Sequence, residues 1–379
     1  MHETTTREQR LPGWTTSGKE HRSNQVIREN APRSTDEVES HLPISAFAVA
    51  LGPFLPTYHL VTDGEEVAHT RHLYRHRSAR QFEADLDLLL QTFSPISLDT
   101  LVEHLEGDVP LPRRSMFLSF DDGLRQQFEI AAPILRRKGV PATFFITRDF
   151  VDNATLFYRF KASLLIDALT GVDERRLARV GSRLQLPRPD HGHCVGAILG
   201  VGHANRALLD ELAEMLELDF DEYLARRRPF LTVGEISSLV AAGFTVGAHS
   251  LDHPHYGELP LQEQLRQTRE SVDFVRSTFA AGPAAFAFPF SDEGVGRAFF
   301  ESAFSTGGLA VSFASGSLPR QQWPRNLRRT MMDEREGSAR QVLSRLASRR
   351  SEARRRGDGV GPLRTWRLTT TRIRAAHIR

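Results

Sequence analysis

The stretch Met116-Phe-Leu-Ser-Phe-Asp-Asp-Gly123 decides the fold of this chain. Its short apolar run ends at two adjacent carboxylates, which predicts a buried strand followed by its exit loop. Adjacent carboxylates repel one another, and a divalent cation is the usual compensation. Because neighbouring side chains diverge in an extended segment, one carboxylate could bind a metal while the other faces a substrate. A turn-forming Asp-Asp-Gly is the alternative for this motif taken alone.

Strand-like apolar runs alternate with amphipathic stretches on both sides of this motif. The further strands are expected at Ala142 to Ile146, Phe244 to Ala248 and Ala284 to Phe288. The helices are expected at 78–93 after a capping box of Ser78 and Gln81, at a stretch ending at Gly139, at 232–243 after a capping box of Thr232 and Glu235, and at 261–279. This alternation predicts a parallel sheet or barrel, with its chemistry in the loops after the strands.

One segment breaks the alternation, because residues 157–228 have a helical pattern without a strand. We interpret it as a largely helical insertion over one face of the barrel. Its histidines, His191, His193 and His203, lie near prolines and a glycine. We therefore expect them to be surface histidines of a loop rather than metal ligands.

Composition limits the remaining possibilities. The chain has 379 residues and a net charge of only +2, so its overall charge does not indicate binding to nucleic acid. It has a single cysteine, which excludes a disulfide framework. Residues 1–43 read as a disordered leader, 44–345 as the catalytic domain and 346–379 as an Arg-rich tail. The tail is either solvated or a peripheral contact to anionic lipid or polymer.

Neither a transmembrane segment nor a signal peptide is expected. The apolar run from Ile44 to Leu55 is too short for a bilayer, which needs roughly 20 residues. It also begins after a polar leader, whereas a signal peptide places its apolar run close to the N-terminus. We expect a cytoplasmic or envelope-associated protein.

A second polar cluster, His249-Ser-Leu-Asp-His-Pro254, follows another predicted strand. Two imidazoles four residues apart suit a borderline metal such as zinc, and Asp252 could orient one of them. His255 has a less useful spacing and is interpreted as a bystander. A chance pair of loop histidines is the alternative. One aspartate and two histidines after neighbouring strands would leave positions open for water and substrate, as in catalytic metal sites.

These motifs resemble the polysaccharide deacetylase (NodB-homology) family, carbohydrate esterase family four. The matching segments are Phe120 to Gly123 with Ala132 to Leu135 and Gly139 to Phe145, His249-Ser250 with His253-Pro254, Phe286 to Phe290, and Tyr58 to Val61. The resemblance implies a distorted (β/α) barrel, a divalent metal with zinc expected first, and hydrolysis of N-acetyl groups on an amino-sugar polymer.

The same resemblance implies roles for individual residues. Asp121 would be the catalytic base, and Asp122, His249 and His253 would be the metal ligands. Apart from the resemblance, the mechanism that we expect has the metal and a backbone N–H in the Pro289-Phe290 segment stabilise the oxyanion that forms on the substrate.

This chain departs from the family at three places. Ala287 and Phe290 stand where the third motif usually has arginine and tyrosine, and the late Leu-x-x-His has no counterpart. His59 would then be either the general acid, as in some relatives, or a structural histidine. The departures leave two alternatives open: a hydrolase of another acylated small glycan, and a catalytically weak carbohydrate-binding protein.

Overall fold

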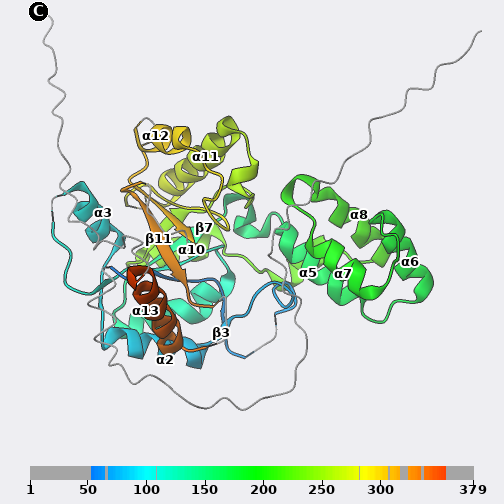
Figure 1. The fold of residues 1–379 in the computed structure, drawn as a ribbon, viewed down its shortest axis with the longest axis horizontal. Helices are drawn as coiled ribbons and strands as arrows, with labels where there is room; N and C mark the ends of the chain where they lie inside the picture. Colours follow the sequence, from blue (N-terminus) through cyan, green and yellow to red (C-terminus); the bar gives the residue numbers. More distant parts are fainter. Residues whose placement is uncertain are drawn as a thin grey trace, which may run out of the picture. The chain divides into compact units, whose positions relative to one another are not determined.

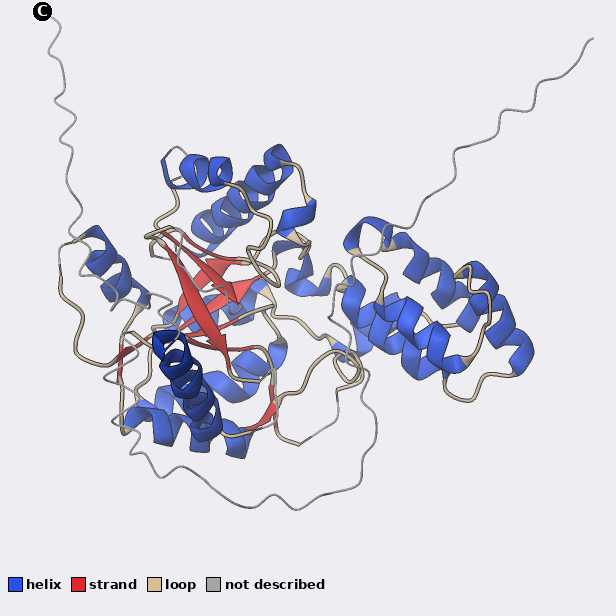
Figure 2. Cartoon of the chain, viewed as in Figure 1, coloured by secondary structure: helices blue, strands red, loops and turns tan. Residues whose placement is uncertain are grey.

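The computed structural model describes residues 53–355 except 65–66, 108, 281, 306–307, 316–322 and 334–336. Within this part of the chain, seven parallel strands close into a barrel in the order β1-β11-β10-β9-β8-β7-β6 (Figure 2). The strands are β1 (Pro56–Tyr58), β6 (Leu118–Phe120), β7 (Ala142–Ile146), β8 (Thr245–Ala248), β9 (Ala285–Ala287), β10 (Val311–Ser315) and β11 (Asn326–Met331). The predicted distorted (β/α) barrel is therefore confirmed.

Two small parallel pairs lie outside the barrel, β2 (Val61–Thr62) with β3 (Arg77–Ser78) and β4 (Ser94–Pro95) with β5 (Ser115–Met116). The α-helices are α2 (Ala79–Leu90), α3 (Leu98–Glu106), α4 (Ala132–Lys138), α5 (Tyr158–Leu169), α6 (Glu174–Arg183), α7 (His191–Leu199), α8 (Ala207–Leu216), α9 (Phe220–Arg227), α10 (Val233–Ala241), α11 (Leu261–Phe279), α12 (Arg297–Ser305) and α13 (Ala339–Arg355). The short helical turns are η1 (Gln127–Ala131), η2 (Arg148–Asn153), η3 (His203–Asn205) and η4 (Tyr256–Glu258).

Local capping explains where several of these helices begin and end. Complete capping boxes at Ser78 and Thr232 start α2 and α10, as predicted. Gly139 ends α4 with a φ of 64°, a left-handed conformation that glycine adopts readily. The predicted boundaries of β8, β9 and α10 differ from the structure by one or two residues. Two differences are larger: α2 ends at Leu90 rather than Phe93, and the strand predicted over 116–120 is split between β5 and β6. The split arises because Met116 pairs with Pro95 and Leu118 with Ala142 of the barrel.

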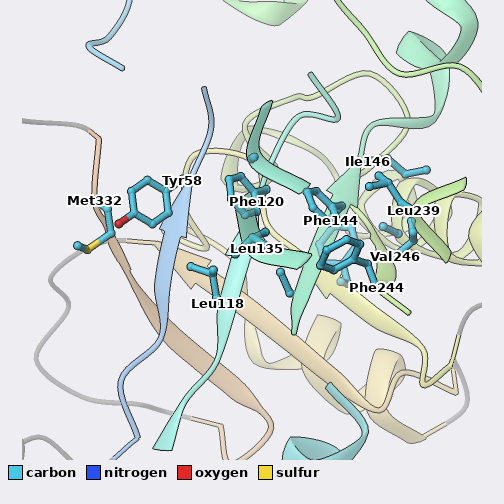
Figure 3. Packing of buried hydrophobic residues seen from close by; sticks show 14 of the residues in the cluster. Tyr58, Leu118, Phe120, Leu135, Phe144, Ile146, Leu239, Phe244, Val246 and Met332 are labelled. Atoms are coloured by element: carbon cyan, nitrogen blue, oxygen red, sulfur yellow. The ribbon is translucent and has the colours of Figure 1, made fainter. Parts of the chain in front are cut away.

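The core lies on both faces of the strands. Phe144 and Phe120 stack at 5.1 Å in the larger apolar cluster, which β6 and β7 share with Leu135 and Leu239 (Figure 3). The next residue of β7, Phe145, belongs to a different cluster with strand residues such as Phe313. Strands buried on both faces read as continuous apolar runs, which is why the sequence shows these strands clearly.

Helices α5 to α9 occupy the region predicted as the insertion, and α5 to α8 form the green group in Figure 1. The interpretation of His191 and His193 as loop residues is wrong. Asp190 caps α7 by accepting from the His193 N–H at 2.9 Å, so both histidines lie in its first turn, where they are exposed.

The predicted leader lies outside the described residues. Helix α13 covers the first ten positions of the predicted tail, and the remainder is likewise outside the described part. No helix among the described residues is long and apolar enough to cross a membrane.

Candidate active site

Asp121 and Asp122 follow β6 at the end of the barrel strand. The Asp121 N–H donates to the Tyr58 carbonyl at 3.0 Å, which extends the β1–β6 pairing by one residue. Asp122 then takes a φ of 75°, unusual for a residue other than glycine. Gly123 follows with a φ of 68°, and a Cβ there would lie 3.1 Å from Ile146. The backbone turns sharply, so the two carboxylates separate.

The backbone of the second motif, His249 to Pro254, is equally unusual. The His249 N–H donates to the Ile146 carbonyl at 2.9 Å, so the residue directly after β8 is fixed against β7. Ser250 and His253 have φ angles of 70° and 61°, and the Ser250 hydroxyl accepts from the His253 N–H at 3.0 Å. Left-handed conformations of this kind cluster at functional sites, because the surrounding structure must stabilise them.

Asp122, His249 and His253 converge on one point. Oδ1 of Asp122 lies 3.5 Å from Nε2 of His249 and 3.2 Å from Nε2 of His253, and the donor atoms lie within 4.8 Å of one another. All three residues are buried. Burial acts to raise the pKa of Asp122, but the two imidazoles outweigh it and hold this pKa well below its usual value.

The donor set fits a divalent metal. Oδ1 of Asp122 is buried without a hydrogen-bond partner among the described residues, an arrangement that is costly unless a cation compensates it. Nδ1 of His249 lies 2.8 Å from the Ala287 carbonyl, which fixes the proton there and leaves Nε2 free to coordinate. Two imidazole nitrogens and one carboxylate oxygen are a typical zinc ligand set with open positions.

The expected orienting role of Asp252 is not what the structure shows. This carboxylate accepts from Gln267 at 2.8 Å and pairs with Nε2 of His203 at 2.8 Å, instead of contacting either ligand-type histidine. His203 is therefore not the surface residue that we predicted, because its side chain is only 12% exposed. The pair joins the helical insertion to the loop that carries His253.

Asp121 has a partner that the sequence motifs did not indicate. Arg329 of β11 donates to both carboxylate oxygens of Asp121 at 2.6 Å, and its Nη1 also lies within hydrogen-bonding distance of Ser119 and Thr57. Both charged side chains are almost fully buried. Burial acts to raise the pKa of Asp121, but the guanidinium outweighs it and lowers this pKa, so the carboxylate stays ionised.

His59 is tied to Asp333, which lies just beyond β11. The ring Nδ1 of His59 is 3.2 Å from Oδ1 of Asp333, and the backbone N–H of His59 donates to Oδ2 of Asp333 at 2.5 Å. Burial acts to lower the pKa of His59, but Asp333 dominates and raises it to about 10. Gln127 connects this residue to the first motif by donating to the carbonyls of His59 and Asp121. His59 is therefore held beside the carboxylates as an imidazolium.

Phe290 borders the site next to His253. Its ring centroid lies 4.6 Å from that of His253 in an edge-on contact, and the His255 ring stacks on Phe290 with 3.8 Å between centroids. His255 is not in the candidate metal group, and its ring packs on Phe290. Phe290 has a φ of 56°, and its N–H makes no hydrogen bond within the described residues. Phe157 of the insertion packs on His253 at 4.5 Å.

Sequence reasoning missed Arg329 and Asp333. The signal was present as Asn326-Leu-Arg-Arg-Thr-Met-Met-Asp333, where charged residues interrupt a short apolar segment. A buried charge requires a partner, so an arginine in such a strand predicts a carboxylate nearby. The structure shows that β11 brings an arginine onto the first motif, although the third motif has none.

The polysaccharide deacetylase family model matches residues 108–297, which is half of the chain. None of the curated proteins matches this sequence. The Streptococcus pyogenes deacetylase PplD, solved in complex with acetate, is 12% identical with a TM-score of 0.50, and the alignment covers 78% of this chain and 98% of PplD. IcaB from Ammonifex degensii is 17% identical with a TM-score of 0.49, covering 77% and 96%.

At these identities the likeness to PplD shows the fold, and the family rests on the family-model match. That match spans both aspartates of the first motif and both histidines of the second. The chain belongs to the polysaccharide deacetylase family and is a hydrolase of carbon–nitrogen amide bonds of that type.

Proposed function

We propose that this protein removes N-acetyl groups from an amino-sugar polysaccharide or glycoconjugate in a metal-dependent reaction that releases acetate. The observation that carries this proposal is the buried convergence of Asp122, His249 and His253 beside the ionised carboxylate of Asp121. A binding protein would have no need for the second carboxylate. Asp121 also has an arginine partner, Arg329 of β11. This weakens the alternative of a catalytically weak carbohydrate-binding protein, because the missing arginine of the third motif was one reason for that alternative.

Asp122, His249 and His253 would hold the metal, with zinc the ion that the nitrogen and oxygen donors favour. A bound zinc ion lowers the pKa of water toward neutrality and polarises a carbonyl group. The carboxylate of Asp122 and the Nε2 atoms of both histidines face one another, which is the arrangement that this role requires.

Asp121 would act as the general base. Its carboxylate is ionised and held by two hydrogen bonds from Arg329, so it can accept a proton from the attacking water without rotating away. The water oxygen forms a bond to the carbonyl carbon, and the carbon–nitrogen bond then breaks.

His59 would act as the general acid. Asp333 keeps its imidazole protonated, so this side chain can deliver a proton to the nitrogen of the departing amino sugar. The N–H of Phe290, which follows Pro289 and makes no hydrogen bond within the described residues, would donate a hydrogen bond to the carbonyl oxygen as it gains charge.

Acetate release tests this proposal directly. The purified chain, loaded with zinc, would be incubated with acetylated chito-oligomers, peptidoglycan fragments and poly-N-acetylglucosamine. We expect acetate from at least one of them, loss of activity after chelation, and recovery when zinc is restored. No acetate from any N-acetylated glycan, with metal bound, would contradict the proposal. Release from O-acetylated glycans alone would favour the hydrolase of another acyl group.

A further inference from the structure

Tyr74 carries a buried hydroxyl group that the proposed mechanism does not use. The hydroxyl oxygen is inaccessible to solvent and has no hydrogen-bond partner among the described residues. The tyrosine ring lies against His59, with 5.4 Å between ring centroids and 43° between planes. A buried polar group without a partner is unfavourable, so its position beside the candidate general acid calls for an explanation.

The segment that carries Tyr74 is held in place by the helical insertion. Nδ1 of His69 lies 2.8 Å from the hydroxyl of Tyr223 on α9. Nε2 of His72 lies 2.7 Å from the carboxylate of Asp167 on α5. Both contacts hold the turn that directly precedes Tyr74, so the tyrosine is presented on a supported backbone.

The hydroxyl can act only as a neutral group. Burial, with smaller contributions from the charges of Asp122 and Asp333, raises the pKa of Tyr74 well above its usual value. The hydroxyl therefore keeps its proton over any working pH range and is suited to donate a hydrogen bond rather than to accept a proton.

We propose that the Tyr74 hydroxyl donates a hydrogen bond to an oxygen of the amino sugar that leaves, which makes Tyr74 a specificity-determining residue. The inference rests on the proposed function. The neighbouring residues decide the assignment. Tyr74 adjoins His59, whose proton would go to the departing nitrogen, whereas the N–H proposed for the carbonyl oxygen is that of Phe290 beside His253. The insertion then contributes to substrate choice by holding Tyr74.

The Tyr74→Phe variant tests this assignment with two substrates. We expect kcat/KM for an acetylated chito-oligomer, or for whichever glycan the wild type hydrolyses, to fall about tenfold. For 4-nitrophenyl acetate, which has no sugar, it should stay within about twofold. The Tm should stay the same or rise, because the removed hydroxyl has no protein partner. Unchanged activity on the glycan, or equal losses on both substrates, would overturn the proposal.

Tyr256→Phe is the matched control. Its hydroxyl is also buried but lies 3.0 Å from the Thr268 hydroxyl, so its removal should lower the Tm and leave kcat/KM unchanged. A fall in Tm for Tyr74→Phe as large as that of the control would assign Tyr74 a structural role and overturn the proposal.

Glycan binding in an Asp121→Asn background separates this inference from the proposed function. Calorimetric titration with the acetylated oligomers should show about tenfold weaker binding when Tyr74→Phe is added. An equal Kd for the Asp121→Asn variant with and without Tyr74→Phe would overturn the role of Tyr74, whether or not the wild type releases acetate. Absence of acetate release by the wild type would contradict the proposed function alone.

Discussion

The two halves of the site are built in different ways. The ligand half, the proposed metal ligands Asp122, His249 and His253, comes from two loops that directly follow β6 and β8. The acid–base half, the proposed base Asp121 and the proposed acid His59, depends on Arg329 and Asp333, which lie 208 and 274 residues further along the chain. Two short motifs that each directly follow a strand therefore mark the first half, whereas closure of the barrel by β11 between β1 and β10 assembles the second. The two halves should respond differently to substitution.

Loss of a ligand should have the largest effect. Asp122→Ala removes the only carboxylate of the ligand half and leaves two buried imidazoles facing each other. We expect bound zinc to fall from one equivalent to a small fraction, and acetate release to fall to the background level. Metal analysis and an acetate assay on the same preparation check this. A variant that kept its zinc and its activity would show that the metal lies elsewhere.

Removal of Arg329 should come next, and it acts on the other half. Arg329→Met leaves the Asp121 carboxylate buried without its partner, so unfolding free energy should fall by about 3–5 kcal/mol. We expect kcat/KM to fall about 100-fold with zinc still bound, because the base loses its orientation. Denaturant unfolding and kinetics measure both effects.

The double variant sharpens this result. Adding Asp121→Asn to Arg329→Met removes the unpaired charge, so it should restore part of the lost stability without restoring activity. Further destabilisation by the second substitution would contradict the paired arrangement.

The smallest effect is expected from Asp333→Asn, and it should appear mainly in the pH profile. The pKa of His59 is raised from its usual 6.5 to about 10, so the stability from its pairing with Asp333 is present below about pH 6.5 and is lost as the pH rises through about 10. Activity that needs protonated His59 should have its alkaline limb near the same value. Without the Asp333 charge, this limb should move toward neutral pH, while the activity at its optimum falls about tenfold.

A second measurement separates this effect from a general loss of structure. His59→Gln should abolish the alkaline limb together with most of the activity, and Asp333→Asn should only move the limb. An unchanged profile in Asp333→Asn would show that His59 is not the acid.

The same contrast explains how far the sequence could predict this molecule. The barrel strands were visible because Ala142 to Ile146 and Phe244 to Ala248 are continuous apolar runs, buried on both faces. The ligand half was visible because its residues follow these runs in short motifs. Strand β11 was missed because two arginines interrupt it, and their burial becomes intelligible only when Asp121 is placed opposite Arg329. His203 was misread for a similar reason, since its partner Asp252 is remote in sequence.

The Asp121→Asn variant tests the central claim most directly, because it changes one oxygen to nitrogen at the base and leaves the ligand half intact. The measurement is bound zinc and acetate release on one preparation, with the Tm as a check of folding. We expect one equivalent of zinc and a loss of kcat on the order of 10³-fold. Full activity in this variant, or loss of the zinc together with the activity, would contradict a division into a ligand half and an acid–base half.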